Sequence, residues 1–413
     1  MAIIVQKFGG TSVADAGKIR RAAARVIKAV KNGFSVVVVA SARGKQTDEL
    51  IADALELNPN PSKREMDQLL STGEQQSVSL FAMALDAAGY DAISFTGGQI
   101  QIVTDSVHTK ARIKSIGAER IQEQLDEGKI VLVAGFQGID ENGNITTLGR
   151  GGSDTTAVAL AAALGAQECE IYTDVDGIHT TDPRIFKKAA KMEQISYDEM
   201  LELSSLGAAV IYIRAVEFGK KYDVKIHVRS SIEEKEGTII THEVPQMEDV
   251  VVSGATVQKD MAKIDLVGVD NKPGNAAKVF ACLANAKVVV NDIMQTEVSS
   301  EKANLSFLIG ILDLSAAKEA AERIKDEVNC EDVFIRDDIA EISVVGVGMR
   351  THYGVAEKMF GALAEAKINI DSITTSEIRI SCVVNKDQAD EALRAVCVAF
   401  ELDKPAQERA KKD

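Results

Sequence analysis

The chain contains few aromatic or rigid residues and no long apolar segment. Its 413 residues include no tryptophan, 4% aromatic residues and six prolines, so the cores must be built mainly from Val, Ile, Leu and Ala. No apolar run approaches the ~20 residues of a membrane-spanning helix. The opening "MAIIVQKFGG" lacks the basic start and long apolar segment of a signal peptide and is typical of a first strand. We therefore expect no membrane association.

Cysteine and histidine are also scarce, and the net charge is strongly negative. Five cysteines without a C-x-x-C pair predict free thiols in a reducing, cytoplasmic setting. Five histidines show no ligand spacing, so we expect no transition-metal site. A net charge of −15 argues against general affinity for nucleic acid or anionic membranes. Any polyanion must therefore meet a local basic or glycine-rich pocket.

Residues 1–240 alternate between apolar strands and amphipathic helices. Stretches such as "IIVQKFG", "SVVVVAS", "KIVLVAGF" and "CEIYTDV" are typical of parallel strands covered on both faces. We therefore predict an α/β fold here, a three-layer αβα sandwich with a mainly parallel sheet. Ligands of such sheets gather at the carboxyl ends of the strands, where this sequence places glycines and short polar residues.

An internal repeat follows this region. Residues 268–293 and 348–373 match at a constant offset of 80, and each copy predicts a βαββαβ unit of the ferredoxin-like α+β type. The expected organisation is a first domain over 1–245, a linker and start of the second region over 246–262, one repeat copy over 263–340, and a second copy with the C-terminal tail over 341–413.

Two short polar motifs follow the first two predicted strands. In "KFGGTS", Gly9 and Gly10 allow backbone N–H groups to approach an anion, and Lys7 adds a positive charge. An ordinary strand-to-helix turn with a solvated lysine explains the motif equally well. In "SARGKQTDEL", Ser41 and Thr47 suit a ligand, but the same stretch also suits a helix cap.

The stretch "GRGGSDTT" combines the most chemistry in the fewest residues. Arg150 can clamp a carboxylate with two hydrogen bonds, while Gly151 and Gly152 offer N–H groups at a helix start. Asp154 can orient a lysine or pair with another cation. A capped helix, with Ser153 or Asp154 as the cap, is the alternative. Capping does not explain the arginine and two glycines together, so we favour a binding site.

Two further stretches carry candidate ligand groups. Glu74, in "STGEQQS", lies within a helical pattern and would hold a substrate ammonium if it faced inward. The loop "YTDVDGIHTTDPR" follows a strand and could take the base and ribose of a nucleotide. Its candidate residues are Thr173, Asp174, Asp182 and Arg184, of which the arginine would reach the phosphates. Taken alone, this loop is only a segment rich in turn formers.

Taken in order, these motifs resemble the aspartokinases of the amino acid kinase family. The matching stretches are "KFGGTS", "SARGKQTD", "STGEQQS", "SFTGGQIQIVTD", "VAGFQG", "GRGGSDTTA", "YTDVDGI…TDPR" and "VRSS…GT", followed by two repeats of ACT type. The resemblance covers essentially the whole chain. It implies phosphoryl transfer from MgATP to the side-chain carboxylate of L-aspartate, the step that opens the pathway to lysine, threonine, methionine and diaminopimelate.

The resemblance also assigns roles to individual residues. It implies that Lys7 is catalytic and that Asp154 orients it. The aspartate pocket would contain Ser41, Thr47, Glu74, Arg150, Gly151, Gly152 and Ser153. The nucleotide would contact Lys7, Gly9, Gly10, Thr173, Asp174, Asp182 and Arg184. Mg²⁺ would be carried mainly by nucleotide oxygens and water, without a protein metal ligand.

Repeats of ACT type typically bind amino acids and pair across chains. The implied effector residues are Asn271, Gly274, Ala276 and Gln295 in the first copy and Asn369 and Ile370 in the second. Lysine, threonine or both are the candidate effectors. The resemblance further implies oligomers through the repeats, including an α₂β₂ assembly whose regulatory subunit starts at or near Met247.

Two other functions remain open from the sequence. Ala209 stands where relatives usually carry a nucleotide-side lysine, which is consistent with a catalytically silent amino-acid sensor. The other open possibility is a related kinase that phosphorylates another amino acid or a nucleotide. Release of ADP with aspartate, glutamate, acetylglutamate or UMP separates these possibilities.

Overall fold

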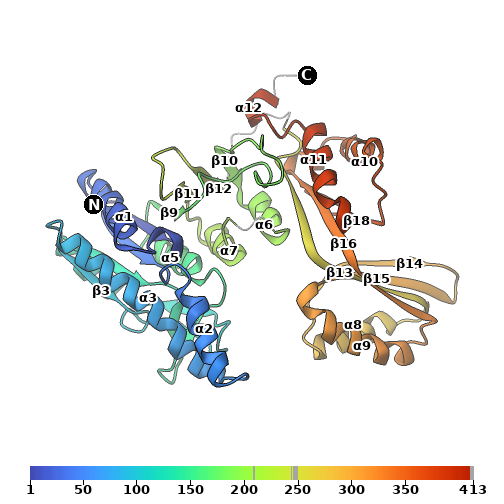
Figure 1. The fold of residues 1–413 in the computed structure, drawn as a ribbon, viewed down its shortest axis with the longest axis horizontal. Helices are drawn as coiled ribbons and strands as arrows, with labels where there is room; N and C mark the ends of the chain where they lie inside the picture. Colours follow the sequence, from blue (N-terminus) through green and yellow to red (C-terminus); the bar gives the residue numbers. More distant parts are fainter. Residues whose placement is uncertain (208–209, 243, 245–249, 410–413) are drawn as a thin grey trace. The chain divides into compact units, whose positions relative to one another are not determined.

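The computed structural model describes residues 1–207, 210–242, 244 and 250–409. The chain forms two compact units, Met1–His179 with Lys191–Pro245 and Thr180–Ala190 with Gln246–Asp413. Ala209 and Met247, on which two expectations rest, lie outside the described residues. Over the part described, no helix has both the length and the apolar character that a membrane span requires. Figure 1 labels the elements of both units.

The first unit is built on an eight-stranded sheet whose neighbouring strands run parallel, except for one antiparallel pair formed by β11 and β12. Across the sheet the strands are β10 (Gln194–Ser196), β12 (Thr238–Thr241), β11 (Ile226–Ser230), β9 (Glu168–Thr173), β1 (Ile3–Phe8), β2 (Ser35–Ala40), β6 (Ile130–Ala134) and β3 (Ala92–Phe95). The predicted parallel α/β sheet is therefore confirmed.

Helices cover both faces of this sheet. Helices α1 (Ala16–Lys31) and α3 (Lys63–Asp86) share one core with β1, β2 and β6, whereas α5 (Gly152–Ala163) packs against β1, β2 and β9 from the other side. The remaining helices of the unit are α2 (Gln46–Leu57), α4 (Glu119–Asp126), α6 (Tyr197–Ser205) and α7 (Ile213–Tyr222). The result is the expected three-layer sandwich.

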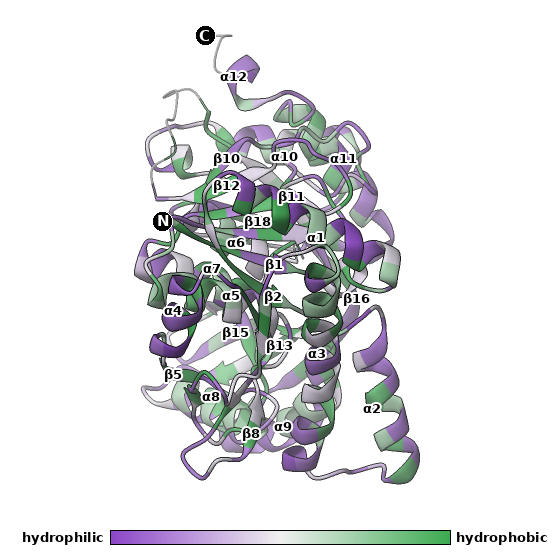
Figure 2. Cartoon of the chain, turned by 90° about the vertical axis from the view of Figure 1, so that its left-hand side faces the viewer, coloured by the Kyte–Doolittle hydropathy of each residue, from purple (hydrophilic) through white to green (hydrophobic). Residues whose placement is uncertain are grey.

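Local sequence explains the two helices that flank β1. Helix α1 begins where the Asp15 carboxylate accepts a hydrogen bond from Lys18 N at 2.9 Å, and its apolar residues recur on one buried face. Helix α5 is buried along almost its whole length, which is why "AVALAAALGA" shows no polar face. In Figure 2, β2 is green along its length, whereas α4 shows a largely hydrophilic, purple surface.

A small four-stranded sheet completes the first unit. Its strands, in spatial order, are β5 (Ile113–Ile116), β4 (Ile102–Thr104), β7 (Gln137–Ile139) and β8 (Ile145–Thr147). Strand β8 packs against α3, and the segment after β8 leads directly into the "GRGGSDTT" stretch. This sheet therefore supports the approach to α5.

The second unit contains one six-stranded antiparallel sheet. In spatial order its strands are β14 (Val290–Glu297), β15 (Lys302–Gly310), β13 (Gly254–Asp270), β16 (Asp332–Val345), β18 (Arg379–Asn385) and β17 (Ser372–Thr375). Its helices are α8 (Asn275–Asn285), α9 (Leu314–Glu327), α10 (Val355–Glu365), α11 (Ala389–Ala399) and α12 (Ala406–Arg409). Short 3-10 helices of the chain are η1 (Gly10–Ser12), η2 (Ile311–Asp313), η3 (Val347–Arg350) and η4 (Lys386–Gln388). Helices α8 and α9 lie side by side (Figure 1).

The two repeat copies share their central strands. The first half of β13 pairs with the second half of β16, with Gly254 opposite Val345 and Gln258 opposite Glu341. After a bulge, the second half of β13 pairs with the first half of β16. Residues that precede the first copy in sequence thus complete the sheet of the second copy. The segment 246–262 is strand from Gly254 onward.

A core phenylalanine of the second unit offers a test of its packing. Phe307 on β15 is 0% exposed and its ring contacts that of Phe280, whereas Phe334 on β16 is 52% exposed. We expect Phe307→Ala to lower the free energy of unfolding of this unit by about 3–5 kcal/mol, because it empties a packed site. Phe334→Ala is the matched control and should change it by much less. Urea unfolding followed by circular dichroism measures both, and equal effects would contradict the assignment of the core.

Candidate active site

The carboxyl ends of four neighbouring strands form the site. Strands β9, β1, β2 and β6 are adjacent and parallel, so the segments that follow them meet at one edge of the sheet. The last residues of these strands and the loops after them carry Thr173, Lys7 with the two glycines, Ser41, and Gly135. Helix α5 begins at the same edge, because Lys7 contacts its first turn.

Lys7 and Asp154 form the central ion pair. Lys7 Nζ lies 2.5 Å from Asp154 Oδ1, and only 11% and 12% of the two side chains is exposed. Along β1, Ile4 and Phe8 face the core under α1, so Lys7 points to the opposite side, toward α5. The contact predicted between the lysine and the aspartate is therefore present. A cation largely shielded from water therefore lies at the end of β1.

The loop after β1 approaches the loop after β2 closely. Gly10 O accepts a hydrogen bond from Gly44 N at 3.0 Å, and Gly9 N donates to Tyr172 O at 3.2 Å. A Cβ at position 10 would lie 2.6 Å from the carbonyl oxygen of Ala42, so no larger residue fits without moving backbone. Glycine is therefore required here because the two backbones approach each other closely.

Glu74 is buried beside Ser41, on the inner side of α3. It is 3% exposed, and its Oε1 accepts a hydrogen bond from Ala42 N at 3.0 Å. Its Oε2 is buried without a hydrogen-bond partner within the described ranges. Burial raises the pKa of Glu74 to about 7, against the opposing effect of the Ala42 hydrogen bond. The inward orientation that a substrate ammonium requires is therefore present.

The helix-cap alternatives do not hold in the structure. Helix α5 starts at Gly152 with Gly151 as its N-cap at φ 65°, and no side chain makes a capping bond. Helix α2 starts at Gln46, likewise without a side-chain cap, so Thr47 does not cap it. Ser153 instead lies against the end of β6, where a Cβ at Gly135 would be 2.7 Å from its Oγ.

Arg150 lines an open pocket on the far side of the α5 start. The pocket has a volume of about 1010 Å³ and is lined by Thr109, Lys110, Arg112, Ile113, Leu148, Gly149, Arg150, Tyr212, Arg214, Glu217 and Phe218. It is rich in positive charge within a strongly acidic chain. Ser41, Thr47 and Glu74 are not among the residues that line this pocket.

The candidate nucleotide residues separate into two groups. Thr173 and Asp174 follow β9 in the first unit, where the Thr173 hydroxyl donates to Asp174 Oδ1 at 3.1 Å. Asp182 and Arg184 belong to the segment Thr180–Ala190 of the second unit and pair with each other at 2.7 Å. Arg184 holds the pKa of Asp182 below its usual range. Their part in nucleotide binding stays a prediction.

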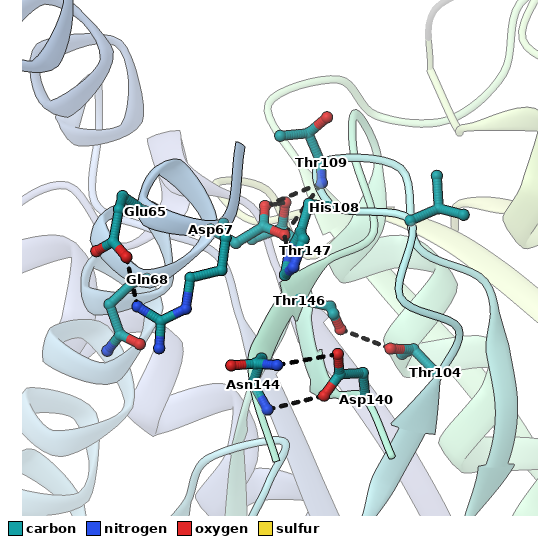
Figure 3. Close-up of polar contacts among 12 residues, drawn as sticks. Glu65, Asp67, Gln68, Thr104, His108, Thr109, Asp140, Asn144, Thr146 and Thr147 are labelled. Carbon is teal, nitrogen blue, oxygen red and sulfur yellow. Dashed lines mark hydrogen bonds and ion pairs between the residues drawn. The ribbon is translucent and has the colours of Figure 1, made fainter. Parts of the chain in front are cut away.

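A buried carboxylate that sequence reasoning missed lies under the Arg150 loop. Asp67 on α3 is 0% exposed and accepts hydrogen bonds from Thr147 Oγ1 at 2.6 Å and from Thr109 N at 3.1 Å (Figure 3). It also lies 2.7 Å from His108 Nδ1. One α3 residue thus joins two segments far apart in sequence. Nothing in the local pattern of "REMDQLL" distinguishes Asp67 from a surface acid.

A second buried polar cluster lies on β9 and β11. Glu168, Glu170 and His227 are close enough to share a metal ion. Both carboxylates already have cationic neighbours, since Lys225 lies 3.1 Å from Glu168 and Arg229 lies 2.5 Å from Glu170. The His227 side chain and Lys225 lower the pKa of Glu168 to about 2. The cluster is therefore charge-compensated by the protein itself.

In the second unit, the four effector candidates of the first copy line one pocket. This cavity of about 320 Å³ is bounded by Val269, Asp270, Asn271, Lys272, Pro273, Gly274, Asn275, Ala276, Gln295, Ala303 and Leu305. Gly274 adopts φ 96° as the N-cap of α8. Lys272 and Lys302 both pair with Asp270 and hold the pKa of its carboxyl well below the usual range.

The corresponding positions of the second copy look different. Asn369 is exposed, whereas Ile370 is partly buried and packs against the core of its own copy. The Ile370 side chain therefore contributes to packing. Any contact it makes with an effector stays a prediction.

Comparisons with known proteins agree with this architecture. The sequence pattern of the amino acid kinase family matches residues 2–230, and that of the ACT domain matches residues 342–400. An aspartokinase of Bacillus sp. (strain MGA3) is 51% identical over 97% of this chain and 98% of its own length. An aspartate kinase of Stutzerimonas stutzeri (strain A1501) is 48% identical over 98% and 99%. Aspartokinase III of E. coli, crystallised with aspartate and ADP, is 25% identical with a TM-score of 0.81, covering 96% of this chain and 99% of that one.

The chain therefore belongs to the amino acid kinase family. Its catalytic part has the fold of that family, and an ACT-type regulatory part follows. Within the family it is an aspartate kinase, a phosphotransferase that phosphorylates aspartate with ATP. This assignment replaces the silent sensor and the relative acting on another substrate.

The raised pKa of Glu74 predicts a pH-dependent cost to stability. Between about pH 4.5 and 7 the folded protein keeps a proton that the unfolded chain has lost, so stability falls as the pH rises through this window. We expect Glu74→Gln not to show this loss. From pH 4 to pH 8 its free energy of unfolding should rise by about 3 kcal/mol relative to that of the wild type. Urea unfolding at several pH values measures the difference.

The matched control for this experiment lies on the same helix. Glu65 is paired with Arg64, and 62% of its side chain is exposed. Glu65→Gln should follow the wild-type pH profile. Parallel profiles for the wild type and Glu74→Gln would show that Glu74 does not carry the linked proton.

Proposed function

We propose that this enzyme makes 4-phospho-L-aspartate as the opening step of lysine, threonine, methionine and diaminopimelate biosynthesis. We further propose that end-product amino acids inhibit it through the ACT-type repeats. The catalytic proposal is carried by two features at neighbouring strand ends. One is the buried Lys7–Asp154 pair, and the other is buried Glu74, one oxygen of which has no hydrogen-bond partner in the described part of the chain. In such a site Lys7 can bind an anionic group, and Glu74 can bind an ammonium group.

The substrate pocket is assigned by charge. Glu74 holds the ammonium of aspartate, because its free oxygen is buried at the end of β2. Arg150 holds the α-carboxylate with a planar, two-armed guanidinium. Ser41, Thr47, Gly151, Gly152 and Ser153 are assigned to the space between them, although the Gly152 N–H already donates to Gly149 O at 3.0 Å. E. coli aspartokinase III binds aspartate, which supports this assignment.

The acceptor carboxylate needs no general base, because it is already ionised at neutral pH. Catalysis then depends on alignment and on stabilisation of negative charge during phosphoryl transfer. Lys7 supplies the positive charge that does this, next to the loop of Gly9 and Gly10. Asp154 keeps the Lys7 ammonium in place. Pre-placed charge of this kind costs no reorganisation when the reaction occurs.

ATP is the phosphoryl donor, and the E. coli relative binds ADP. The close-packed loop of Gly9 and Gly10 and the buried lysine fit a phosphate group at this edge of the sheet. Thr173 and Asp174 are assigned to the base and ribose side. The roles of Asp182 and Arg184, which belong to the second unit, stay predictions. Mg²⁺ would be held by phosphate oxygens and water and would neutralise charge on the transferred group.

The regulatory site is assigned to the pocket of the first repeat copy. Asn271 and Gln295 provide amide groups, while Gly274 and Ala276 lie at the start of α8. A volume of about 320 Å³ suits one amino acid. Lysine, threonine or both are the proposed effectors. Association through the repeats, including an α₂β₂ form with a subunit starting near Met247, belongs to the same proposal.

The catalytic assignment is tested by substrate range and by Lys7. We expect ADP release with L-aspartate and none with L-glutamate, acetylglutamate or UMP. Lys7→Ala should lower kcat roughly 100-fold or more, because transition-state charge loses its partner. Lys31→Ala, which removes an exposed lysine of α1, is the control and should have normal kcat. Near-normal turnover by Lys7→Ala would remove the role given to this lysine.

The effector assignment is tested by inhibition curves. Gln295→Ala should raise the lysine or threonine concentration for half-inhibition about 10-fold, within the usual range of allosteric coupling. Its kcat without effector should stay unchanged. Asn285→Ala, which changes an exposed residue at the end of α8, is the control and should be inhibited at the same effector concentration as the wild type. Unaltered inhibition of Gln295→Ala would place the effector elsewhere.

A further inference from the structure

Arg214 joins two backbone segments that lie far apart in sequence. It stands in the first turn of α7 and is half-buried. Its Nη1 donates to Leu148 O at 2.7 Å, and its Nη2 donates to Ala111 O at 3.0 Å. Leu148 comes two residues before Arg150. One guanidinium therefore connects α7, the segment before the substrate arginine, and the segment before β5.

The segment before β5 is itself fixed to the protein interior. Ala111 N donates to Thr147 O at 2.9 Å, so the two segments already run side by side. Asp67 anchors both of them to α3 through Thr109 N and the Thr147 hydroxyl (Figure 3). Arg214 thus connects Leu148 to the segment around Ala111, which Asp67 already holds through Thr109.

The loop that carries Arg150 is held by its backbone: Leu148 N donates to Phe136 O at 2.9 Å, and Gly152 N donates to Gly149 O at 3.0 Å. Gly149 and Gly151 flank the arginine at φ 80° and 65°, and neither has a side chain that could anchor the loop. Arg150 is exposed and makes no hydrogen bond or ion pair in the portion of the chain that the structure describes. The Arg150 side chain therefore does not itself fix the loop, and backbone bonds and neighbouring side chains do.

Helix α7 supplies those neighbours. A Cβ on Gly151 would lie 2.1 Å from the side chain of Tyr212, so this residue packs directly on the loop. Arg214 adds two charge-assisted hydrogen bonds to backbone carbonyls, which are stronger than bonds between neutral groups. The planar fork of arginine reaches two acceptors at once, which a lysine ammonium on a flexible stem does not reproduce.

We propose that Arg214 is a positioning residue for aspartate: by bonding Leu148 and Ala111 it fixes the loop from which Arg150 reaches the α-carboxylate. This inference rests on the substrate role of Arg150 proposed above. It predicts that Arg214 affects binding of aspartate and not of ATP, because the nucleotide residues follow other strands.

Charge alone is the competing explanation. Arg214 is one of four cations that line the open pocket, with Lys110, Arg112 and Arg150. Arg112 is exposed, and its backbone N–H, not its guanidinium, bonds to Asp105. Arg112→Gln therefore removes the same charge from the same pocket without cutting a connection between segments.

The first experiment measures steady-state kinetics of four enzymes: the wild type, Arg214→Gln, Arg214→Lys and Arg112→Gln. We expect Arg214→Gln to raise KM for aspartate roughly 10-fold or more, since small displacements of a binding group are costly. KM for ATP should not change, and kcat should change far less than KM for aspartate. Arg214→Lys should remain impaired, and Arg112→Gln should resemble the wild type.

The second experiment is a double-mutant cycle with Arg150→Ala. If Arg214 acts through Arg150, then adding Arg214→Gln to Arg150→Ala will raise KM for aspartate no further. A purely structural role would give additive effects and would also alter KM for ATP. Thermal unfolding of each variant verifies folding, and Arg214→Lys decides the question if Arg214→Gln does not fold.

Each contrary outcome is distinct. A normal KM for Arg214→Gln, equal losses in Arg214→Gln and Arg112→Gln, full activity of Arg214→Lys, or additivity in the cycle would overturn the positioning role alone. An Arg150→Ala enzyme with unchanged KM for aspartate would overturn the substrate role of Arg150, and the positioning role with it.

Discussion

The ion pair between Lys7 and Asp154 is the interaction on which the site depends. It joins the end of the central strand β1 to the first turn of α5 in a largely dehydrated place. Removing two charges from water is costly, and apolar residues of similar size would often stabilise a fold at least as well. A pair kept at this cost, at the edge of a parallel sheet, is consistent with a catalytic need for fixed charge. The buried length of α5 then provides a rigid mount for Asp154.

Other unfavourable features lie at the same edge. Burial raises the pKa of Glu74 to about 7, and one of its oxygens has no hydrogen-bond partner among the residues that the structure describes. Phe136 adopts φ 70°, a conformation that non-glycine residues seldom take, just after β6. Neighbouring glycines permit backbone contacts that any side chain would block. Strain and uncompensated charge tend to gather where a protein acts, and the well-packed cores around them offset the cost.

The regulatory unit depends on a different constraint, the sharing of two long strands. Because β13 and β16 each serve both repeat copies, neither copy has a complete sheet of its own. The segment Thr180–Ala190 is also part of this unit, where Thr180 O accepts from Ala255 N at 2.8 Å. Continuous strands therefore join the two copies into one sheet.

The sequence by itself determined the alternation of strands and helices, the repeat at constant offset, and the polar motifs at the strand ends, because these follow from local periodicity and from residue types. It also predicted the Lys7–Asp154 contact and the four residues that line the first-copy pocket. Only the tertiary structure decided that Asp67 bonds Thr109 and Thr147 and that Arg214 bonds Leu148 and Ala111. It also decided that Asp182 and Arg184 belong to the second unit and that the second copy uses a strand from before the first. These contacts join residues far apart in the chain, and local patterns carry no information about such partners.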